Sequence, residues 1–530
     1  MPYVTLMIVI PLAAALLLLA VPEDRVDVAK ALAVLGALAT VVVGAVMVAD
    51  FDRSEGGLQF VDRQNWADQV GLEWIVGVDG ISLWLLMLTA GLFLVAIASL
   101  VWKTPNRPIA FLALLLLGEA GLMGVFAAGN LVLFYVFWEA MLIPFYFLIG
   151  MWGGQRRAIA TTKFVIYTML GSLLMLVAIV ATAFSAQDVT GQFTFEIAEL
   201  KGIDFGGTTS TLLFLGFAVA FVIKLPLWPF HGWLPDAYVA APIVVTGLLA
   251  AVMSKAGAYG FLRIGLPLFP EGADKLALAI GILSVIGIVY GSLLAWRAHT
   301  MRLLVGYSSL AHLGFILLGI VAFDVQAGQG AVLQMVNHGI VVVAAFTIVG
   351  VIMRGTGGDE VIDDVGGLAA RAPRLTWVFL VVAMASLAIP GSNSFVGEFF
   401  ILTGVFRQHI VLAVLATIGI VYAAVYMLRL YQTSTALREK GVDARRAELR
   451  TVDYVTLAPV LIVMFLIALW PMSLMGATEA SVEEAIAPAQ IAAERPADQI
   501  AVEVEPNPPP EAVPLPGDEA DTLPEDGATP

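Results

Sequence analysis

The chain is dominated by long apolar stretches that are separated by mostly short polar connections. A helix that crosses a bilayer needs about 20 mostly apolar residues, and a window of that length finds 14 candidate segments among the 530 residues. They begin near residues 3, 28, 79, 108, 130, 163, 211, 241, 275, 303, 330, 375, 408 and 453. The longer connections are 50–78, 188–210 and the basic stretch 433–452. This pattern predicts an all-α polytopic membrane protein with about 14 transmembrane helices.

Two of the expected segments contain helix breakers at corresponding places. The seventh holds Pro226 and Pro229 directly after Lys224, and the twelfth holds Pro390 followed by Gly391. Proline removes a helix hydrogen bond and clashes with the preceding turn, and broken helices inside a bilayer are typical of transport sites. Because the breaks are five segments apart, we expect two inverted five-helix repeats with functional sites at broken helices 7 and 12.

This interpretation divides the chain into five parts. We expect helices 1–3 over 1–107, the first repeat (helices 4–8) over 108–266, and the second repeat (helices 9–13) over 267–432. A basic cytoplasmic loop and helix 14 follow over 433–475. The last part, 476–530, is rich in proline and acidic residues, so we expect a disordered tail.

Composition supports the membrane assignment and removes several functions. Hydrophobic residues make up 60% of the chain and charged residues 13%, whereas soluble domains have roughly 45–50% and 25%. There is no cysteine, which excludes cysteine-ligated iron–sulfur clusters, disulfides and cysteine-based zinc sites in this chain. The chain from Pro471 onward contains 13 acidic residues and one basic residue, so this part carries −12 of the net charge of −15. The negative net charge of the chain therefore comes mainly from its C-terminal end and not from the first 470 residues.

Lysine and arginine indicate the orientation. They are concentrated in the connections that follow odd-numbered segments, as in Arg156, Arg157 and Lys163, and such loops remain on the cytoplasmic side. With 14 segments, both termini are then expected outside the cell. The first segment lacks a basic start and a small-residue cleavage site, so we do not expect a signal peptide.

Seven ionisable residues lie well inside the apolar segments, where a charge is costly to bury. Carboxylates, amines and imidazoles that share one core can exchange protons, and histidine titrates near neutral pH. This mixture predicts a proton relay across the membrane without covalent catalysis. The candidates are Glu119, Glu139, Lys224, Lys255, His312, His338 and Glu398.

Structural roles compete with this interpretation at several positions. Glu119 lies near two glycines, and satisfying a neighbouring helix is about as plausible for it as a function. His312 alone fits a packing histidine as well. For the remaining polar positions we expect capping, loop hydrogen bonds or interfacial solvation; these are Asp79, His231, Asp236, His299 and His409.

Several familiar motifs are absent from the sequence. No Gly-Lys dipeptide exists, so there is no Walker A phosphate loop. No Gly-x-Gly-x-x-Gly opens a helix, and no two histidines are spaced four apart. The driving energy is therefore expected to come from ion gradients or partner subunits.

The stretches around the candidate residues carry a resemblance. FYVFWEAMLIP contains Glu139, KLPLWPFHGWLPDAYVAAP begins at Lys224, and SKAGAYG contains Lys255. GYSSLAHLGF, QMVNHG and PGSNSFVGEF follow in order around His312, His338 and Glu398. Together they resemble the antiporter-like proton-channel family over about segments 3 to 13. The family includes three membrane-arm subunits of respiratory complex I and subunits of multisubunit sodium/proton antiporters.

Within this family, the resemblance favours the M-type branch of bacterial NADH:quinone oxidoreductase. L- and N-type subunits are expected to carry lysine where this chain has Glu398, and M-type subunits glutamate. The resemblance implies a charge switch between Glu139 and Lys224, a central relay at Lys255, a path through both histidines, and an exit-side group at Glu398.

The resemblance also implies partners and a location. We expect a bacterial inner-membrane protein that binds other membrane subunits of complex I, especially the L- and N-type subunits, and no nucleic acid. No cofactor is expected in this chain, because flavin, iron–sulfur clusters and quinone would belong to partner subunits. Tyr238 replaces the usual histidine, and the loop from Arg297 to Arg302 lacks the usual Asp and Lys-Arg pair. Two alternatives remain, a sodium/proton antiporter subunit and a non-conducting structural subunit.

Overall fold

The computed structural model describes residues 1–67, 72–435 and 447–495. Residues Met1–Ala493 form one compact unit, and a second unit covers 494–530, of which only Glu494 and Arg495 are described. The expected basic loop therefore lies largely outside the described residues, as does the acidic tail from residue 496.

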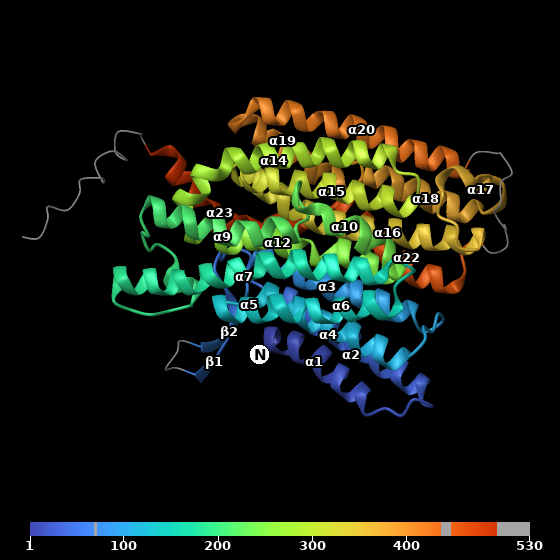
Figure 1. Ribbon diagram of the computed structural model, residues 1–530, viewed down its shortest axis with the longest axis horizontal. Helices are drawn as coiled ribbons and strands as arrows, with labels where there is room; N and C mark the ends of the chain where they lie inside the picture. Colours follow the sequence, from blue (N-terminus) through green and yellow to red (C-terminus); the bar gives the residue numbers. More distant parts are fainter. Residues whose placement is uncertain (68–71, 436–446, 496–530) are drawn as a thin grey trace, which may run out of the picture. The chain divides into compact units, whose positions relative to one another are not determined.

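Helices dominate the described residues, and twelve spans are long and apolar enough to cross a membrane (Figure 1). They are α2 (Val26–Asp50), α3 (Gly80–Ser99), α4 (Pro108–Ala127), α5 with α6 (Leu131–Trp152), α7 (Arg157–Thr190), α9 (Gly207–Lys224), the segment from α11 to α13 (Ile243–Leu268), α14 (Pro270–Arg297), α15 (Met301–Ile320), α16 (Val325–Thr356), α20 (Ile410–Thr435) and α22 (Thr451–Leu469). Two shorter apolar helices are α1 (Tyr3–Leu19) and α18 (Pro373–Ser386). The all-α membrane fold is thus confirmed, whereas 14 crossings and inverted repeats stay predictions.

Both predicted helix breaks are present. Helix α9 ends at Lys224, and after the two prolines a 3-10 turn η2 (Phe230–Trp233) leads into α10 (Leu234–Ala240). Helix α18 ends at Ser386, and α19 (Asn393–Gln408) begins only after Pro390 and Gly391, whose φ is +92°. Each break leaves backbone groups without helical partners at the places where the sequence predicts functional sites.

The eighth expected segment departs from regular α-helix on both sides of Lys255. It consists of α11 (Ile243–Leu248), the π-helical turn η3 (Leu249–Met253), α12 (Lys255–Gly260), a second π-helical turn η4 (Phe261–Gly265) and α13 (Leu266–Leu268). Gly257 packs tightly here, since a Cβ would lie 2.4 Å from the Phe221 carbonyl oxygen on α9. Single π-turns inside helices are frequent at functional sites.

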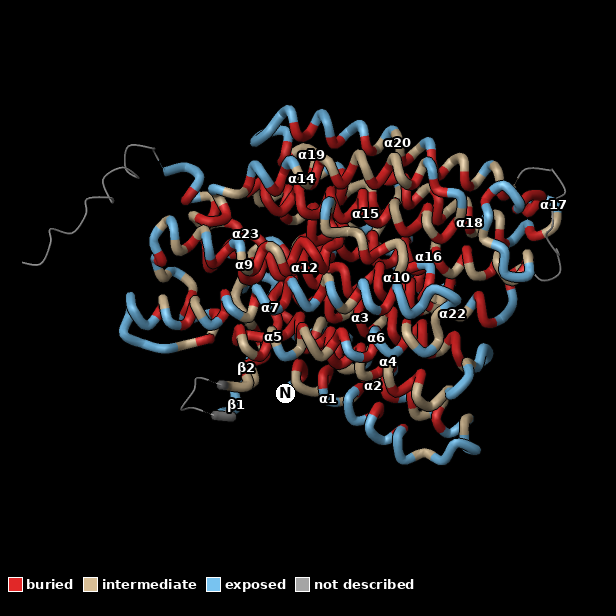
Figure 2. The backbone as a smooth tube through the Cα atoms, viewed as in Figure 1, coloured by how far each residue is buried: buried red, intermediate tan, exposed pale blue. Residues whose placement is uncertain are grey.

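Burial divides the bundle into an inner and an outer part (Figure 2). Helices α15 and α16 are almost entirely buried, whereas α7 and α20 expose large apolar side chains such as Val177 and Val411. Exposed contiguous apolar surface of this kind marks a face that water does not contact. The outer faces therefore suit a lipid environment, and the ionisable residues lie on the inner helices.

The polar connection between α2 and α3 contains an antiparallel hairpin of β1 (Gln59–Ala67) and β2 (Leu72–Val78). Short helices fill other connections: α8 (Ile197–Leu200), η5 (Ile362–Asp364) and α17 (Leu368–Arg371). These elements lie at the ends of the bundle and do not carry candidate residues.

One domain boundary was wrong. The tail was expected to be disordered from residue 476, but Met472–Glu494 forms helix α23. Its small and apolar residues recur at helical spacing and form a buried stripe, and Ser481 Oγ accepts a hydrogen bond from Gly80 N at 2.8 Å at the start of α3. The prediction failed because acidic composition was averaged over the whole C-terminal part, although the proline-rich stretch begins only after this helix.

Candidate functional site: a buried chain of ionisable residues

Four predicted residues form a continuous chain of contacts in the buried core. Lys255 Nζ lies 2.6 Å from His338 Nδ1, the imidazoles of His338 and His312 have centroids 5.4 Å apart, and His312 Nδ1 lies 2.9 Å from Glu398 Oε1. They come from α12, α16, α15 and α19, and each is less than 10% exposed. The contacts therefore follow the order Lys255, His338, His312 and Glu398.

Hydrogen-bond chemistry restricts the protons in this chain. A lysine ammonium only donates. When Lys255 is charged, His338 Nδ1 therefore accepts from it, and the proton of a neutral ring then resides on Nε2. Lys255 also donates to the Ala250 carbonyl oxygen at 2.6 Å and contacts Ser254 Oγ at 3.4 Å. At the other end, a carboxylate only accepts, so in the ionised form of Glu398 the hydrogen bond comes from His312 Nδ1. The carbonyl of Ala250 belongs to η3, which the π-helical geometry places next to the ammonium.

Both imidazoles line a small cavity. His312, His338, Ser308 and Gln334 are among its lining residues, and its volume is about 10 Å³. A cavity needs roughly 10–15 Å³ to hold one water, together with polar partners. The imidazoles thus line a space at the lower limit of the volume that one water molecule needs. His338 Nε2 is buried and without a partner among the described residues.

Neutral polar residues that sequence analysis missed support the chain. Gln334 Nε2 donates to Glu398 Oε1 at 3.0 Å. Asn337 Nδ2 donates to the Asn393 carbonyl oxygen at 2.7 Å, and Asn393 Nδ2 donates to Asn337 Oδ1 at 3.0 Å. These bonds join α16 to the first turn of α19 after the break, so they fix the half-helix that carries Glu398. In the sequence, these amide residues could have been found only as polar positions in apolar segments close to His338 and Gly391.

The remaining three candidates are not joined to this chain by direct contacts. Lys224 is 1% exposed, and its ammonium lies 4.8 Å from the centre of the Trp138 ring without a hydrogen-bond partner among the described residues. Glu139, next to Trp138 on α5, is half-buried and interacts electrostatically with Lys224, but no ion pair within 4.0 Å joins them. Glu119 is fully buried on α4, and neither carboxylate oxygen has a partner in the described part of the chain.

The structure separates structural polar residues from this set. Asp79 caps α3 in a capping box, as expected, and its second carboxylate oxygen accepts from buried Arg263 at 3.2 Å. Sequence analysis did not single out Arg263, which lies near the end of its apolar segment. Asp236 contacts Lys163 at 2.5 Å instead of capping, while the imidazole of His231 packs edge-on against Tyr290 at 5.4 Å.

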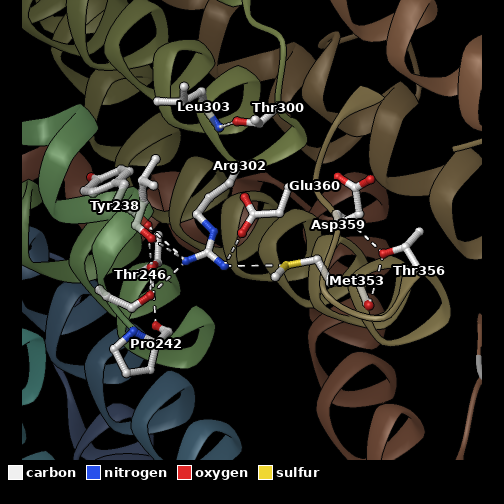
Figure 3. Close-up of polar contacts among 12 residues, drawn as sticks. Tyr238, Pro242, Thr246, Thr300, Arg302, Leu303, Met353, Thr356, Asp359 and Glu360 are labelled. Carbon is white, nitrogen blue, oxygen red and sulfur yellow. Dashed lines mark hydrogen bonds and ion pairs between the residues drawn. The ribbon is translucent and has the colours of Figure 1, made fainter. Parts of the chain in front are cut away.

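A further buried arginine, Arg302, holds together one end of both expected repeats (Figure 3). Its Nη1 donates to the carbonyl oxygens of Val239 at 3.0 Å and Ala241 at 2.9 Å, at the end of α10, and lies 3.4 Å from that of Tyr238. Its Nη2 lies 2.7 Å from a carboxylate oxygen of Glu360, after α16. The guanidinium thus neutralises a helix C-terminus and fixes α10 relative to α15 and α16.

Comparison with known proteins identifies the family. The family model for the NADH:quinone oxidoreductase/Mrp antiporter transmembrane region matches residues 128–423, more than half of the chain. The chain belongs to this family. The matched region contains every residue of the contact chain together with Glu139 and Lys224, and it begins after Glu119.

Individual members of the NADH:quinone oxidoreductase/Mrp antiporter family are similar over nearly the whole chain. The NADH-quinone oxidoreductase subunit M of Rhodobacter capsulatus is 42% identical over 80% of this chain and 84% of its own length. A chain of respiratory complex I from Thermus thermophilus with bound NADH matches with a TM-score of 0.81 and 29% identity, covering 91% of this chain and 99% of that one. A chain of the Mrp complex from Dietzia matches with a TM-score of 0.80 at 21% identity, over 93% and 98%, and shows the shared fold alone.

Proposed function

We propose that this chain is the proton-translocating M-type membrane subunit of a bacterial NADH:quinone oxidoreductase and has no redox centre of its own. The single observation that carries this proposal is the unbroken contact chain from Lys255 to Glu398 in a membrane core. The similarity to a subunit M at 42% identity supports the choice of complex. The described residues contain no group of His, Asp and Glu arranged to hold a metal ion.

In this proposal, protons move by relay between fixed groups. A proton that Lys255 gives to His338 Nδ1 is balanced by release of the proton from Nε2 of the same ring into the small cavity. A water there passes a proton to His312, and His312 Nδ1 gives its own proton to Glu398. Each imidazole thus accepts at one nitrogen and releases at the other, which is the chemistry that suits histidine to proton transfer near neutral pH.

The first repeat supplies the switch. Glu139 and Lys224 interact electrostatically but form no ion pair within 4.0 Å, so a movement of either group changes the electrostatic potential at Lys255. A pair of this kind titrates as one coupled unit. We assign both termini to the outer side of the inner membrane and expect neighbouring L- and N-type subunits, with NADH oxidation and quinone reduction in other subunits of the complex.

NADH-driven proton uptake by inverted membrane vesicles tests the proposal, with NADH oxidation followed in the same vesicles. Glu139→Ala is expected to lower both rates by about tenfold or more with normal assembly, because each ~1.4 kcal/mol added to the barrier costs a factor of ten. Glu23→Ala, at an exposed glutamate in a loop, is the matched control.

Two other results would replace the proposal. If Glu139→Ala leaves NADH-driven uptake unchanged while the cells lose sodium tolerance, the antiporter function is correct. If the variant changes neither property, the chain is a non-conducting structural subunit.

A further inference from the structure

A cavity with both polar and apolar walls lies at the end of the bundle where α3 ends and α22 begins. Its volume is about 90 Å³, and residues of α3, α11, α16 and α22 line it; we call it the α22 cavity. A water molecule takes up about 30 Å³ in the liquid, so the cavity has room for about three waters. Five of its lining residues have polar side chains: Ser99, Lys103, Thr347, Asp453 and Thr456.

The polarity of the wall changes along the α22 cavity. At the outer end, Lys103 follows α3 with a side chain that is 51% exposed, and Asp453 lies in the first turn of α22. The lining residues furthest from this end of the bundle are Leu92 on α3, Leu248 on α11 and Val343 on α16. All three are apolar and less than 10% exposed. The cavity thus leads inward from a half-exposed lysine to a buried apolar wall.

The groups at the outer end suit water. The Thr347 hydroxyl donates to the Val343 carbonyl oxygen at 2.8 Å, so its own oxygen can still accept a hydrogen bond. Lys103 Nζ lies 3.8 Å from Asp453 Oδ1, a separation at which a bridging water can join two groups. Burial lowers the pKa of Lys103, although the charge of Asp453 opposes this shift. This lysine therefore exchanges protons with water more readily than an ordinary lysine.

The inner end of the α22 cavity lies close to the relay. Val343 follows His338 by five residues on α16, which is about 7.5 Å at 1.5 Å per residue. Leu248 directly precedes the π-helical turn η3. The carbonyl oxygen of Ala250, inside η3, accepts the hydrogen bond from Lys255 Nζ at 2.6 Å. The first turn beyond the cavity is therefore already bonded to the relay lysine.

A tightly packed contact separates the α22 cavity from the relay. A Cβ at Gly339 on α16 would lie 2.9 Å from the Ala251 carbonyl oxygen in η3, so only a glycine permits this approach of the two backbones. Water therefore reaches Lys255 from the cavity only when η3 moves relative to α16. Single π-helical turns inside helices are frequent at functional sites.

We propose that the α22 cavity holds water that enters past Lys103 and supplies protons to Lys255 through η3. The proposal rests on the proposed function, because it names the entry side of the same relay. After Lys255 has given a proton to His338, its neutral amine accepts a proton from a cavity water. That water regains a proton from bulk water at the outer end, so no charge remains in the cavity.

Hydroxyl-radical footprinting of the intact purified complex tests the hydration, because the radicals form from water and oxidise the side chains next to it. Phe346 lines the α22 cavity and is 1% exposed. Phe379 is 5% exposed and lines an apolar cavity of about 10 Å³ between α15, α16, α18 and α20, and apolar cavities stay dry. Mass spectrometry should find Phe346 oxidised at least about tenfold faster than Phe379.

Filling the α22 cavity tests the supply of protons. Thr347→Leu removes the hydroxyl and adds apolar volume, so oxidation of Phe346 and NADH-driven proton uptake in vesicles should both fall about tenfold. Thr347→Ser keeps the hydroxyl and should preserve both rates. The matched control is Thr417→Leu, at an exposed threonine of α20 whose hydroxyl also donates to the carbonyl oxygen four residues earlier. If Thr347→Leu does not assemble, Ser99→Val fills the cavity from α3.

Three results would overturn the proposal. Equal oxidation of Phe346 and Phe379 means that the cavity is dry. Unchanged proton uptake in Thr347→Leu, with lowered oxidation of Phe346 and slow uptake in His338→Leu, means that the cavity water does not feed the relay although the proposed function stands. Uptake at the wild-type rate in both variants means that the proposed function fails, and this proposal fails with it.

Discussion

Replacing His338 tests the order of the contact chain, because this residue alone joins Lys255 to the second histidine. In His338→Leu, Lys255 Nζ keeps the Ala250 carbonyl oxygen and Ser254 Oγ as partners but loses its shortest side-chain contact. The substitution preserves buried volume to within a small change, and His338 Nε2 has no partner that would be left unpaired among the described residues. A functional effect without structural damage is therefore expected.

The size of the effect follows from the lost contact. A hydrogen bond to a charged group contributes about 1.5–3 kcal/mol, and each ~1.4 kcal/mol is a factor of ten. If protons pass through His338, NADH-driven proton uptake in inverted vesicles should fall about 10- to 100-fold, and NADH oxidation should fall with it. His338→Asn retains an acceptor for Lys255 but cannot exchange protons, so it should be equally slow.

His409→Leu provides the matched control, since it makes the same chemical change at an exposed histidine after α19. A path through His338 would be excluded by an assembled His338→Leu complex whose proton uptake stays within about twofold of the wild type, a difference below 0.5 kcal/mol. Such a result would mean that protons bypass the imidazole pair.

Three further predictions concern positions outside the relay. Gly257→Ala brings a Cβ to 2.4 Å from the Phe221 carbonyl oxygen and should reduce the amount of assembled complex on native gels, whereas Gly476→Ala meets no atom within 4 Å and should not. Arg302→Met removes the ion pair with Glu360 and the hydrogen-bond donors to the end of α10. The expected loss of stability is about 1–3 kcal/mol, so thermal inactivation should be about tenfold faster. An unchanged rate would mean that Arg302 does not stabilise the contact between α10, α15 and α16. Burial raises the pKa of Glu360, although the charge of Arg302 opposes this shift. A raised carboxyl pKa means that the folded protein loses stability as the pH rises through that pKa. Glu360→Gln should therefore flatten the pH dependence of thermal inactivation above the ordinary glutamate range, and a pH profile identical to that of the wild type would contradict this prediction.

The sequence was sufficient to predict properties that depend on composition along a single segment. The length of the apolar stretches predicted the membrane-spanning helices. The prolines after Lys224 and at Pro390 predicted both helix breaks, and charges inside apolar segments predicted the buried ionisable residues. Each of these signals is local, because the cost of burying a charge or breaking a helix is set where it occurs. The error at α23 had the same origin, since an average over many acidic residues hid a short stripe of small residues.

The resemblance implied a path from Lys255 through both histidines to Glu398, but not which histidine contacts which neighbour, because that depends on contacts between residues far apart in sequence. Lys255 meets His338, and His312 meets Glu398, and no spacing along the chain distinguishes this arrangement from its alternatives. The neutral partners Gln334 and Asn337 carry no charge that would mark them in an apolar helix. Their function follows only from the acceptor or donor that faces them.

The described structure separates the seven candidates into two groups, and the difference bears on gating. The four residues of the contact chain, from Lys255 to Glu398, each contact another member of the chain. Glu119 and Lys224, both in the expected first repeat, are buried without hydrogen bonds in the described part of the chain, an arrangement that costs free energy in a medium of low dielectric constant. These two residues can be stabilised by a change of conformation, hydration or partner, whereas the ends of the contact chain already have partners. The interruption between Lys224 and Lys255, at the break of α9 and beside the π-helical turns, is therefore where control of the relay is best placed.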